Sequence, residues 1–255
     1  MEHLNLNQHV QYLRLQLLEM SRVSQRAVDY STKAHGLGGA DFCANARNGA
    51  FEVDQLYREI TESTNELLLA DLPSESDLRF VLSANHICEA LYNIYAHAGE
   101  IATLSMRLLE NASSRDIRVI AMGEEVNRMV RLSVVALFEQ EVEFAKMTLP
   151  NQCFELFCGY SLYDDNESVE KTQERIIARH LQQITLETNR MNDAISFWLE
   201  GMDYECSPHQ WLTPVADRKI RENPARKIRN LSERYRGSLA HYCTDRTRLP
   251  SLRGM

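Results

Sequence analysis

Two Cys/His pairs near the C-terminal end of the sequence could supply the ligands of a zinc ion. Cys206-x-x-His209 and His241-x-Cys243 together offer four nitrogen and sulfur donors, the set that structural zinc sites use. The pairs meet only if the last helical segment folds back, and their spacing matches no regular zinc pattern. The alternative is that all six cysteines are reduced thiols, with Cys88, Cys153 and Cys158 packed in apolar surroundings.

A second group of possible metal ligands lies on one helical face. His86 and His97 are eleven residues apart, which is three helical turns, and Glu89 and Glu100 repeat the same spacing. Such a polar stripe could bind a metal ion, although a solvated helix face is the commoner meaning of the pattern.

The sequence lacks the motifs of the common enzyme classes. It contains no Gly-x-Ser-x-Gly segment and no Glu-x-x-His pair, which a di-iron helical bundle requires. The glycines around Gly36 are followed by neither the lysine nor the hydroxyl residue of a phosphate-binding loop, so they predict a helix connector. We expect a protein that is not an enzyme. A metalloenzyme on a helical bundle is an alternative hypothesis, and the missing Glu-x-x-His pair argues against it.

Low proline and glycine content, 6 and 10 residues in 255, favours long helices over a loop-rich β fold. Apolar residues recur every three or four positions in six segments and predict helices there. The segments are residues 6–36, 53–70, 74–108, 119–147, 166–202 and 214–242. Residues 151–163 stay unassigned, and the pattern predicts an all-α protein of two tandem three-helix bundles.

Charge is distributed unevenly along the chain. Residues 215–255 carry eleven Lys and Arg against four Asp and Glu, a net charge of +7, whereas the whole chain has a net charge of −8. This basic segment is either a docking surface, with Arg226, Lys227 and Arg229 at its centre, or a solvated face. No nucleic-acid motif accompanies the charge, so the sequence does not predict a nucleic-acid partner.

The sequence predicts a cytoplasmic location. No apolar run approaches the ~20 residues that a membrane span needs. The start, Met1-Glu2-His3-Leu4-Asn5, lacks the basic and apolar regions of a signal peptide. Scattered cysteines in a chain of this length also favour a reducing compartment.

Two motifs stand out: the opening Leu4-Asn5-Leu6-Asn7-x-His9, and Pro73 followed by Ser74-x-x-Asp77-Leu78-Arg79. They resemble the PhoU family, bacterial regulators of phosphate uptake built from two tandem three-helix bundles. Pro214 repeats the position of Pro73 at an offset of 141 residues. The resemblance implies bundles at residues 1–112 and 113–243 and a tail at 244–255. Asp77 and Arg79 are expected to fix the start of the third helix.

The family's metal ligands are largely missing from this chain. The resemblance implies a Glu and an Asp four residues apart in each repeat, with an acid such as Glu52 or Asp54 on a neighbouring helix. Those positions hold Tyr92 and Ala96 in the first repeat and Glu233 and Gly237 in the second. Glu233 is therefore the one candidate metal ligand of this type, and no cofactor is predicted.

The resemblance implies a non-enzymatic adaptor that acts through protein–protein contacts. Its expected partners are the ATPase of a phosphate ABC transporter and a sensor histidine kinase, with a second copy of the chain as a further partner. Membrane contact is expected only through these partners. The alternative hypothesis is a PhoU-fold scaffold that has left phosphate control and docks a partner through its basic C-terminal helix.

Overall fold

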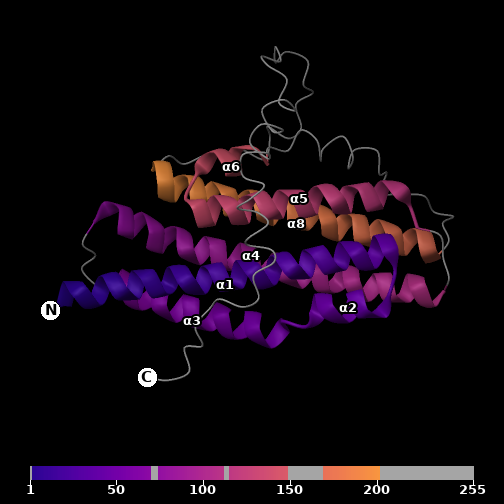
Figure 1. The fold of residues 1–255 in the computed structure, drawn as a ribbon, viewed down its shortest axis with the longest axis horizontal. Helices are drawn as coiled ribbons and strands as arrows, with labels where there is room; N and C mark the ends of the chain where they lie inside the picture. Colours follow the sequence, from indigo (N-terminus) through magenta and orange to yellow (C-terminus); the bar gives the residue numbers. More distant parts are fainter. Residues whose placement is uncertain (1, 70–73, 112–114, 149–168, 202–255) are drawn as a thin grey trace, which may run out of the picture. The chain divides into compact units, whose positions relative to one another are not determined.

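The computed structural model describes residues 2–69, 74–111, 115–148 and 169–201, all of which lie in a compact unit that extends from Met1 to Trp211. A second unit, Leu212–Met255, lies outside the described residues. Within the described part every regular element is an α-helix, which confirms the all-α prediction (Figure 1). None of the described helices is long and apolar enough to cross a membrane.

The elements follow one another along the chain in the order of their numbers. They are α1 (Glu2–Leu37), α2 (Ala40–Arg47), α3 (Ala50–Leu68), α4 (Glu75–Glu110), α5 (Ile117–Glu139), α6 (Val142–Lys146) and α8 (Val169–Glu200).

The predicted apolar stripes form the core of the bundle. In α4 the residues that define the stripe are all buried: Ala84, Ile87, Leu91, Ile94, Ala98, Ile101 and Leu108. The same holds for the stripe of α8, at Ile177, Leu181, Ile184, Met191, Ile195 and Trp198. A recurrence every three or four residues therefore located the core-facing side of both helices correctly.

Helix α4 begins where the sequence predicts. Ser74 is the N-cap, and its hydroxyl oxygen accepts a hydrogen bond from the backbone N–H of Asp77 at 3.1 Å. The Ser74 hydroxyl donates in turn to the Asp77 carboxylate at 2.5 Å. The interpretation of Asp77 as a helix-start residue is therefore supported by its contacts.

Two element predictions differ from the structure. Residues 36–39 do connect helices, but they lead into α2, a short helix that the sequence analysis missed because it buries only the small residues Cys43 and Ala46. The single helix expected over residues 119–147 is divided into α5 and α6 at Gln140, which has a left-handed φ of 55°. No glycine or proline marks this break, so composition could not reveal it.

The long helices are packed in definite directions. Ser24 and Met20 of α1 contact Leu91 and Cys88 of α4, so these two helices run parallel. Contacts from Arg79 to Trp198 and from His97 to His180 show that α4 and α8 are antiparallel.

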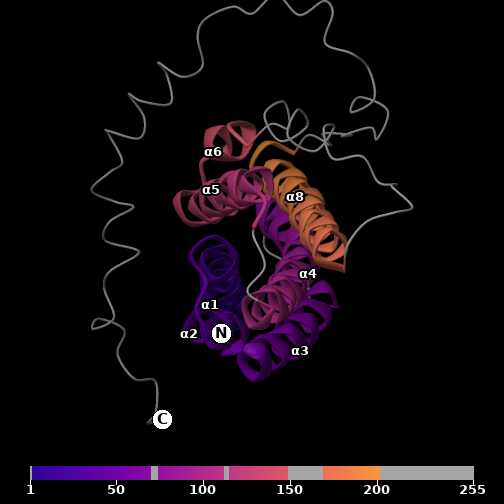
Figure 2. The ribbon, with the colours of Figure 1, turned by 90° about the vertical axis from the view of Figure 1, so that its right-hand side faces the viewer.

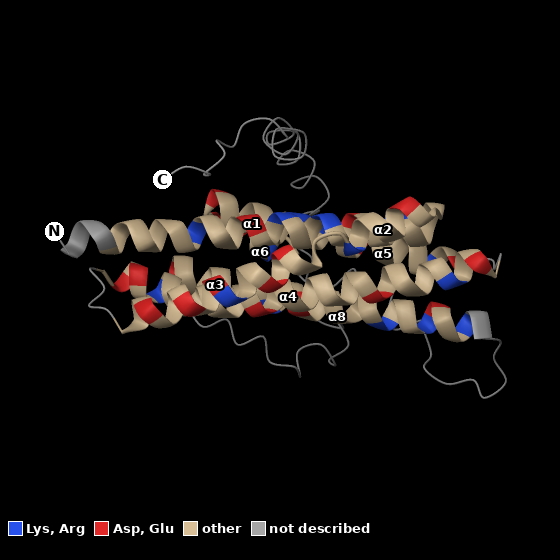
Figure 3. Ribbon diagram, turned by 90° about the horizontal axis from the view of Figure 1, so that it is seen from below, with Lys and Arg blue, Asp and Glu red and all other residues tan. Residues whose placement is uncertain are grey.

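Helix α5 packs against both α1 and α8. It lies antiparallel to α1, with Asn127 near Asp29 and Arg115 near Gly36. Seen end-on, α1, α4, α8 and α5 surround a common core, while α2 and α3 cover α1 and α4 (Figure 2). Charged residues of both signs are interspersed along the described helices (Figure 3).

Several sequence predictions fall on residues outside the described part. They include the sixth helix at 214–242, the segment 151–163 and the predicted start of the fifth helix at residue 166. The bundle boundaries at residues 112 and 243 stay predictions.

Candidate functional site

The position of α4 where the sequence resemblance implies a carboxylate holds an aromatic side chain instead. Tyr92 of α4 is half-buried and packs on Tyr57 of α3, with ring centroids 4.8 Å apart and an interplanar angle of 48°. The negative charge of the nearby Asp54 raises the pKa of Tyr92, and burial adds to that rise. Ala96, one turn further along α4, is exposed. This face of the bundle therefore presents phenol rings and one carboxylate.

Glu52, the other candidate acid of α3, lies near α1. Burial and the charge of Glu19 on α1 raise the pKa of Glu52. Because residues 52 and 54 are two positions apart on a helix, Glu52 and Asp54 point in different directions and cannot share one ion. Among the described residues, no group of three or more His, Cys, Asp or Glu side chains is placed to hold a metal ion.

A groove of about 890 Å³ lies between α2 and the C-terminal half of α4. Its lining contains small side chains, among them Ala44, Ala96 and Ala102, with Arg47, Glu100 and Arg107 also present. Apart from Gly99 itself, its two chain neighbours and the adjacent backbone of α4, no described atom lies within 4 Å of the position that a Cβ of Gly99 would occupy. Sequence reasoning missed this groove because it missed α2, which forms one of its walls.

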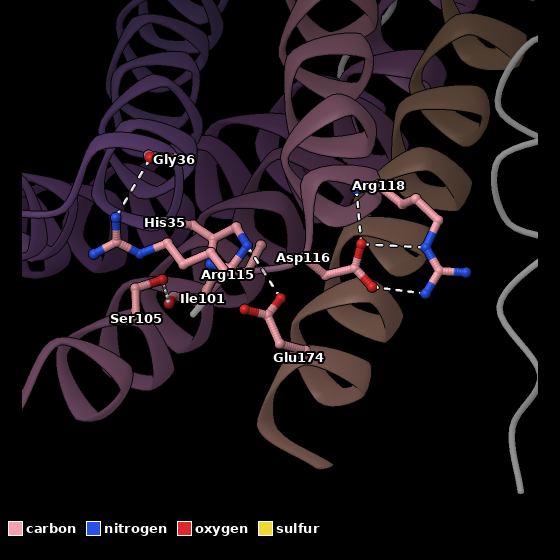
Figure 4. A network of polar contacts seen from close by, with 8 residues as sticks. All are labelled: His35, Gly36, Ile101, Ser105, Arg115, Asp116, Arg118 and Glu174. Atoms are coloured by element: carbon pink, nitrogen blue, oxygen red, sulfur yellow. Dashed lines mark hydrogen bonds and ion pairs between the residues drawn. The ribbon is translucent and has the colours of Figure 1, made fainter. Parts of the chain in front are cut away.

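A polar network joins three helix ends at one end of the bundle (Figure 4). His35 of α1 and Glu174 of α8 are both buried, with Nε2 and Oε2 3.2 Å apart. Arg115 donates to the carbonyl of Gly36 at 3.4 Å, and the Asp116 carboxylate caps α5 by accepting from the N–H of Arg118 at 2.9 Å. The network holds the end of α1 against the beginnings of α5 and α8.

The polar stripe predicted on α4 divides into two parts. His86, Glu89 and Glu100 are exposed, as a solvated face requires. His97 is half-buried and faces His180 of α8, with their Nδ1 atoms 3.1 Å apart. This contact between two helices is not predictable from the spacing of residues within α4.

Cys88 behaves as the sequence predicts. It is fully buried beside Met20, and burial raises the pKa of its thiol to about 12, so it stays protonated and unreactive. The remaining predicted site residues lie outside the described part of the chain. They are Cys153, Cys158, the zinc candidates Cys206, His209, His241 and Cys243, the acid-pair positions Glu233 and Gly237, and the basic residues Arg226, Lys227 and Arg229.

Comparison with solved structures places this arrangement among known folds. The crystal structure of PhoU from Pseudomonas aeruginosa superposes with a TM-score of 0.68 at 19% sequence identity, covering 77% of this chain and 99% of that one. The phosphate transport system regulatory protein PhoU from Streptococcus pneumoniae gives a TM-score of 0.64 at 21% identity, covering 78% and 98% of the two chains.

The chain has a PhoU-like fold. This confirms the helical-bundle architecture that the sequence resemblance implied. The sequence matches no protein-family model, and a search of curated proteins finds no match either. The chain therefore has a PhoU-like fold at about one-fifth sequence identity to these two proteins.

Proposed function

We propose that this chain is a non-catalytic helical adaptor that regulates phosphate transport. The observation that carries the proposal is the PhoU-like fold, which spans nearly the whole length of two PhoU structures. One of these proteins is named as a regulatory protein of a phosphate transport system. The absence of common enzyme motifs in the sequence supports a role exercised through contacts.

The described helices suit a protein that works through its outer surfaces. The apolar stripes are buried in a shared core, and Ser74, Asp77 and Arg79 are engaged within the bundle itself. Exposed apolar side chains such as Tyr12, Leu15 and Phe51 remain on the outer faces of α1 and α3. Exposed apolar groups of this kind are usual components of protein interfaces. The proposed partners are the ATPase of a phosphate ABC transporter and a sensor histidine kinase.

Direct binding measurements test this function. The purified full-length chain is titrated with the phosphate-transporter ATPase and with the sensor kinase of the same organism, in high and in low phosphate. An ATPase from an unrelated ABC transporter of that organism is the matched control. We expect saturable binding to one of the two phosphate-system proteins and none to the control. Binding to neither, or equal binding to the control, would contradict the proposal.

A second test separates the structural role of Asp77 from a regulatory one. Asp77→Ala is expected to lower stability, because it removes a contact at the start of α4, without abolishing partner binding once the variant is folded. Unchanged stability together with lost regulation would show that Asp77 contacts a partner instead.

A PhoU-fold scaffold outside phosphate control is the second candidate function. Tyr92 and Ala96 favour it, because they stand where the family resemblance places a carboxylate pair, and Tyr92 packs on Tyr57 instead. In this case the basic segment containing Arg226, Lys227 and Arg229 is the proposed docking element.

Charge reversal tests the second candidate. The partner is first identified by cross-linking in the native host, and its affinity is then measured for the variant Arg226→Glu/Lys227→Glu/Arg229→Glu. We expect weaker binding with a smaller salt dependence. Reversing Arg246, Arg248 and Arg253 changes the net charge equally and is the control. An unchanged affinity, or an equal loss in both variants, would exclude specific docking through Arg226, Lys227 and Arg229.

A further inference from the structure

The His97–His180 contact brings two imidazole nitrogens to the separation that a shared metal ion requires. The two Nδ1 atoms are 3.1 Å apart, and the ring centroids lie 5.3 Å apart at an interplanar angle of 48°. Two imidazole nitrogens bound to one Zn²⁺ ion, each at about 2.0–2.1 Å, lie about 3.0–3.4 Å from each other. The observed separation falls within that range.

The surrounding helices hold both rings in place. On α4, His97 lies beside the fully buried Ala98, and on α8, His180 lies beside the buried Leu181. The two helices are antiparallel, and a second contact, between Phe80 and Trp198, fixes the opposite end of their interface. The pair is therefore set by the packing of the bundle and does not depend on an exposed loop.

The charge state of the pair suits a metal ligand. Burial lowers the pKa of His97 against the opposing charges of Glu187 and Glu100. Burial, together with His97 and Arg179, lowers the pKa of His180, while Glu100 opposes this. Both shifts favour the neutral imidazole, which is the form that binds metal. In the metal-free form one Nδ1–H donates to the other Nδ1.

Glu100 supplies negative charge beside the pair. It lies three residues after His97, on the same side of α4, and its charge acts on both histidines. Its side chain is exposed. As the side chains stand, the described residues include no set of three metal ligands. Water, and Glu100 after rotation, would complete the coordination.

We propose that His97 and His180 form a two-histidine site for a divalent transition metal ion, Zn²⁺, Cu²⁺ or Ni²⁺, that links α4 to α8. Imidazole ligands favour these ions over Mg²⁺ and Ca²⁺. The site uses neither Tyr92 nor Ala96, so it differs from the carboxylate positions that the family resemblance implies. It also does not depend on the proposed regulatory function. An ion bound here stabilises the contact between an early and a late helix of the chain.

Calorimetric titration with Ni²⁺ tests the site. The full-length, reduced chain is compared with His97→Asn and His180→Asn at pH 7.5, and His86→Asn, which removes an exposed histidine of the same helix, is the matched control. We expect each of the first two variants to lose more than about tenfold in affinity at one site. The control should bind as the unaltered chain does. Saturating Ni²⁺ should raise the melting temperature of the unaltered chain and of the control only.

Two results would overturn the proposal. One is an unchanged Ni²⁺ affinity in either His97→Asn or His180→Asn, which would assign any binding to other residues. The other is the absence of a Ni²⁺-dependent rise in the melting temperature of the unaltered chain. If an asparagine variant loses its helical circular dichroism, glutamine replaces asparagine. A Cu²⁺ electron paramagnetic resonance spectrum of the unaltered chain without imidazole nitrogen coupling would also overturn the proposal.

Discussion

At the scale of single residues, the N-cap of α4 shows how a short motif controls a long helix. The Ser74 hydroxyl and the Asp77 carboxylate contact each other, and the Ser74 oxygen accepts from a backbone N–H that the helix leaves without an intrahelical partner. The Ser-x-x-Asp spacing in the sequence is therefore sufficient to locate the start of α4.

Removal of this cap has a measurable cost. We expect Ser74→Ala to lower the free energy of unfolding by about 0.5–2 kcal/mol in urea titrations followed by circular dichroism. Ser76→Ala, two positions further along the same exposed turn, is the control and should be nearly neutral. Equal effects of the two substitutions on the free energy of unfolding would contradict the assignment of Ser74 as the N-cap.

Asp193 of α8 introduces a dependence of stability on pH. Burial raises the pKa of its carboxyl to about 6, above the value of 3.8 that it has in the unfolded chain. Between about pH 4 and 6 the folded state therefore binds the extra proton, and stability falls as the pH rises through this window.

Substitution of Asp193 tests that direction. Asp193→Asn should be more stable than the unaltered chain at pH 7.5, by about 1 kcal/mol after allowance for partial solvent screening. The two proteins should converge near pH 4. Denaturant unfolding at a series of pH values measures the difference. A stability difference that does not change between pH 4 and 7.5 would contradict the assignment.

At the scale of elements, one hydroxyl attaches the α2–α3 connection to α4. The Tyr95 hydroxyl accepts from the N–H of Gly49 at 3.1 Å and donates to the carbonyl of Arg47 at 2.9 Å. Gly49 is packed so closely that an added Cβ would lie 2.6 Å from a methyl group of Val23. Both contacts fix the position where α2 ends and α3 begins.

Loss of that hydroxyl should loosen this connection. We expect Tyr95→Phe to destabilise the chain by about 1–2 kcal/mol, because it leaves an N–H and a carbonyl without their partner. Hydrogen exchange should be faster in residues 48–53 than in the unaltered chain. Tyr12→Phe, at an exposed tyrosine of α1, is the matched control. Unchanged exchange at residues 48–53 would show that packing alone holds the connection.

At the scale of the whole described unit, three helices meet at one aromatic cluster. Phe80 of α4 and Trp198 of α8 have ring centroids 4.8 Å apart. The guanidinium of Arg14, on α1, lies 4.9 Å from the Phe80 centroid and 5.2 Å from that of Trp198. This cluster joins helices that the resemblance assigns to different bundles, so the two bundles are expected to unfold together.

Trp198→Ala tests that cooperativity. We expect it to lower the free energy of unfolding by about 3–5 kcal/mol and to shift a single thermal transition of the helical unit. Differential scanning calorimetry and circular dichroism at 222 nm should give coincident curves. Phe51→Ala, at an aromatic residue that is 82% exposed, is the control. Two separate transitions in the variant would instead support bundles that fold independently on either side of residue 112.

Within the described residues, the sequence by itself located the long helices and, for α4 and α8, the faces that are buried. The stripes of α4 and α8 and the cap at Ser74 follow from local periodicity and local hydrogen bonding, which act over a few residues. The motifs around Pro73 also led to the correct fold. Because these local patterns extend over only a few residues, they did not reveal the small helix α2 or the break at Gln140.

Only the tertiary structure decided which helix faces meet and what chemistry their contacts allow. Nothing in the spacing within α4 places Tyr92 on Tyr57 or His97 against His180. An apolar stripe specifies that a face is buried, but any complementary stripe can cover it. The choice depends on the packing of all the helices together, because each partner is selected by shape and by contacts between residues distant in the chain.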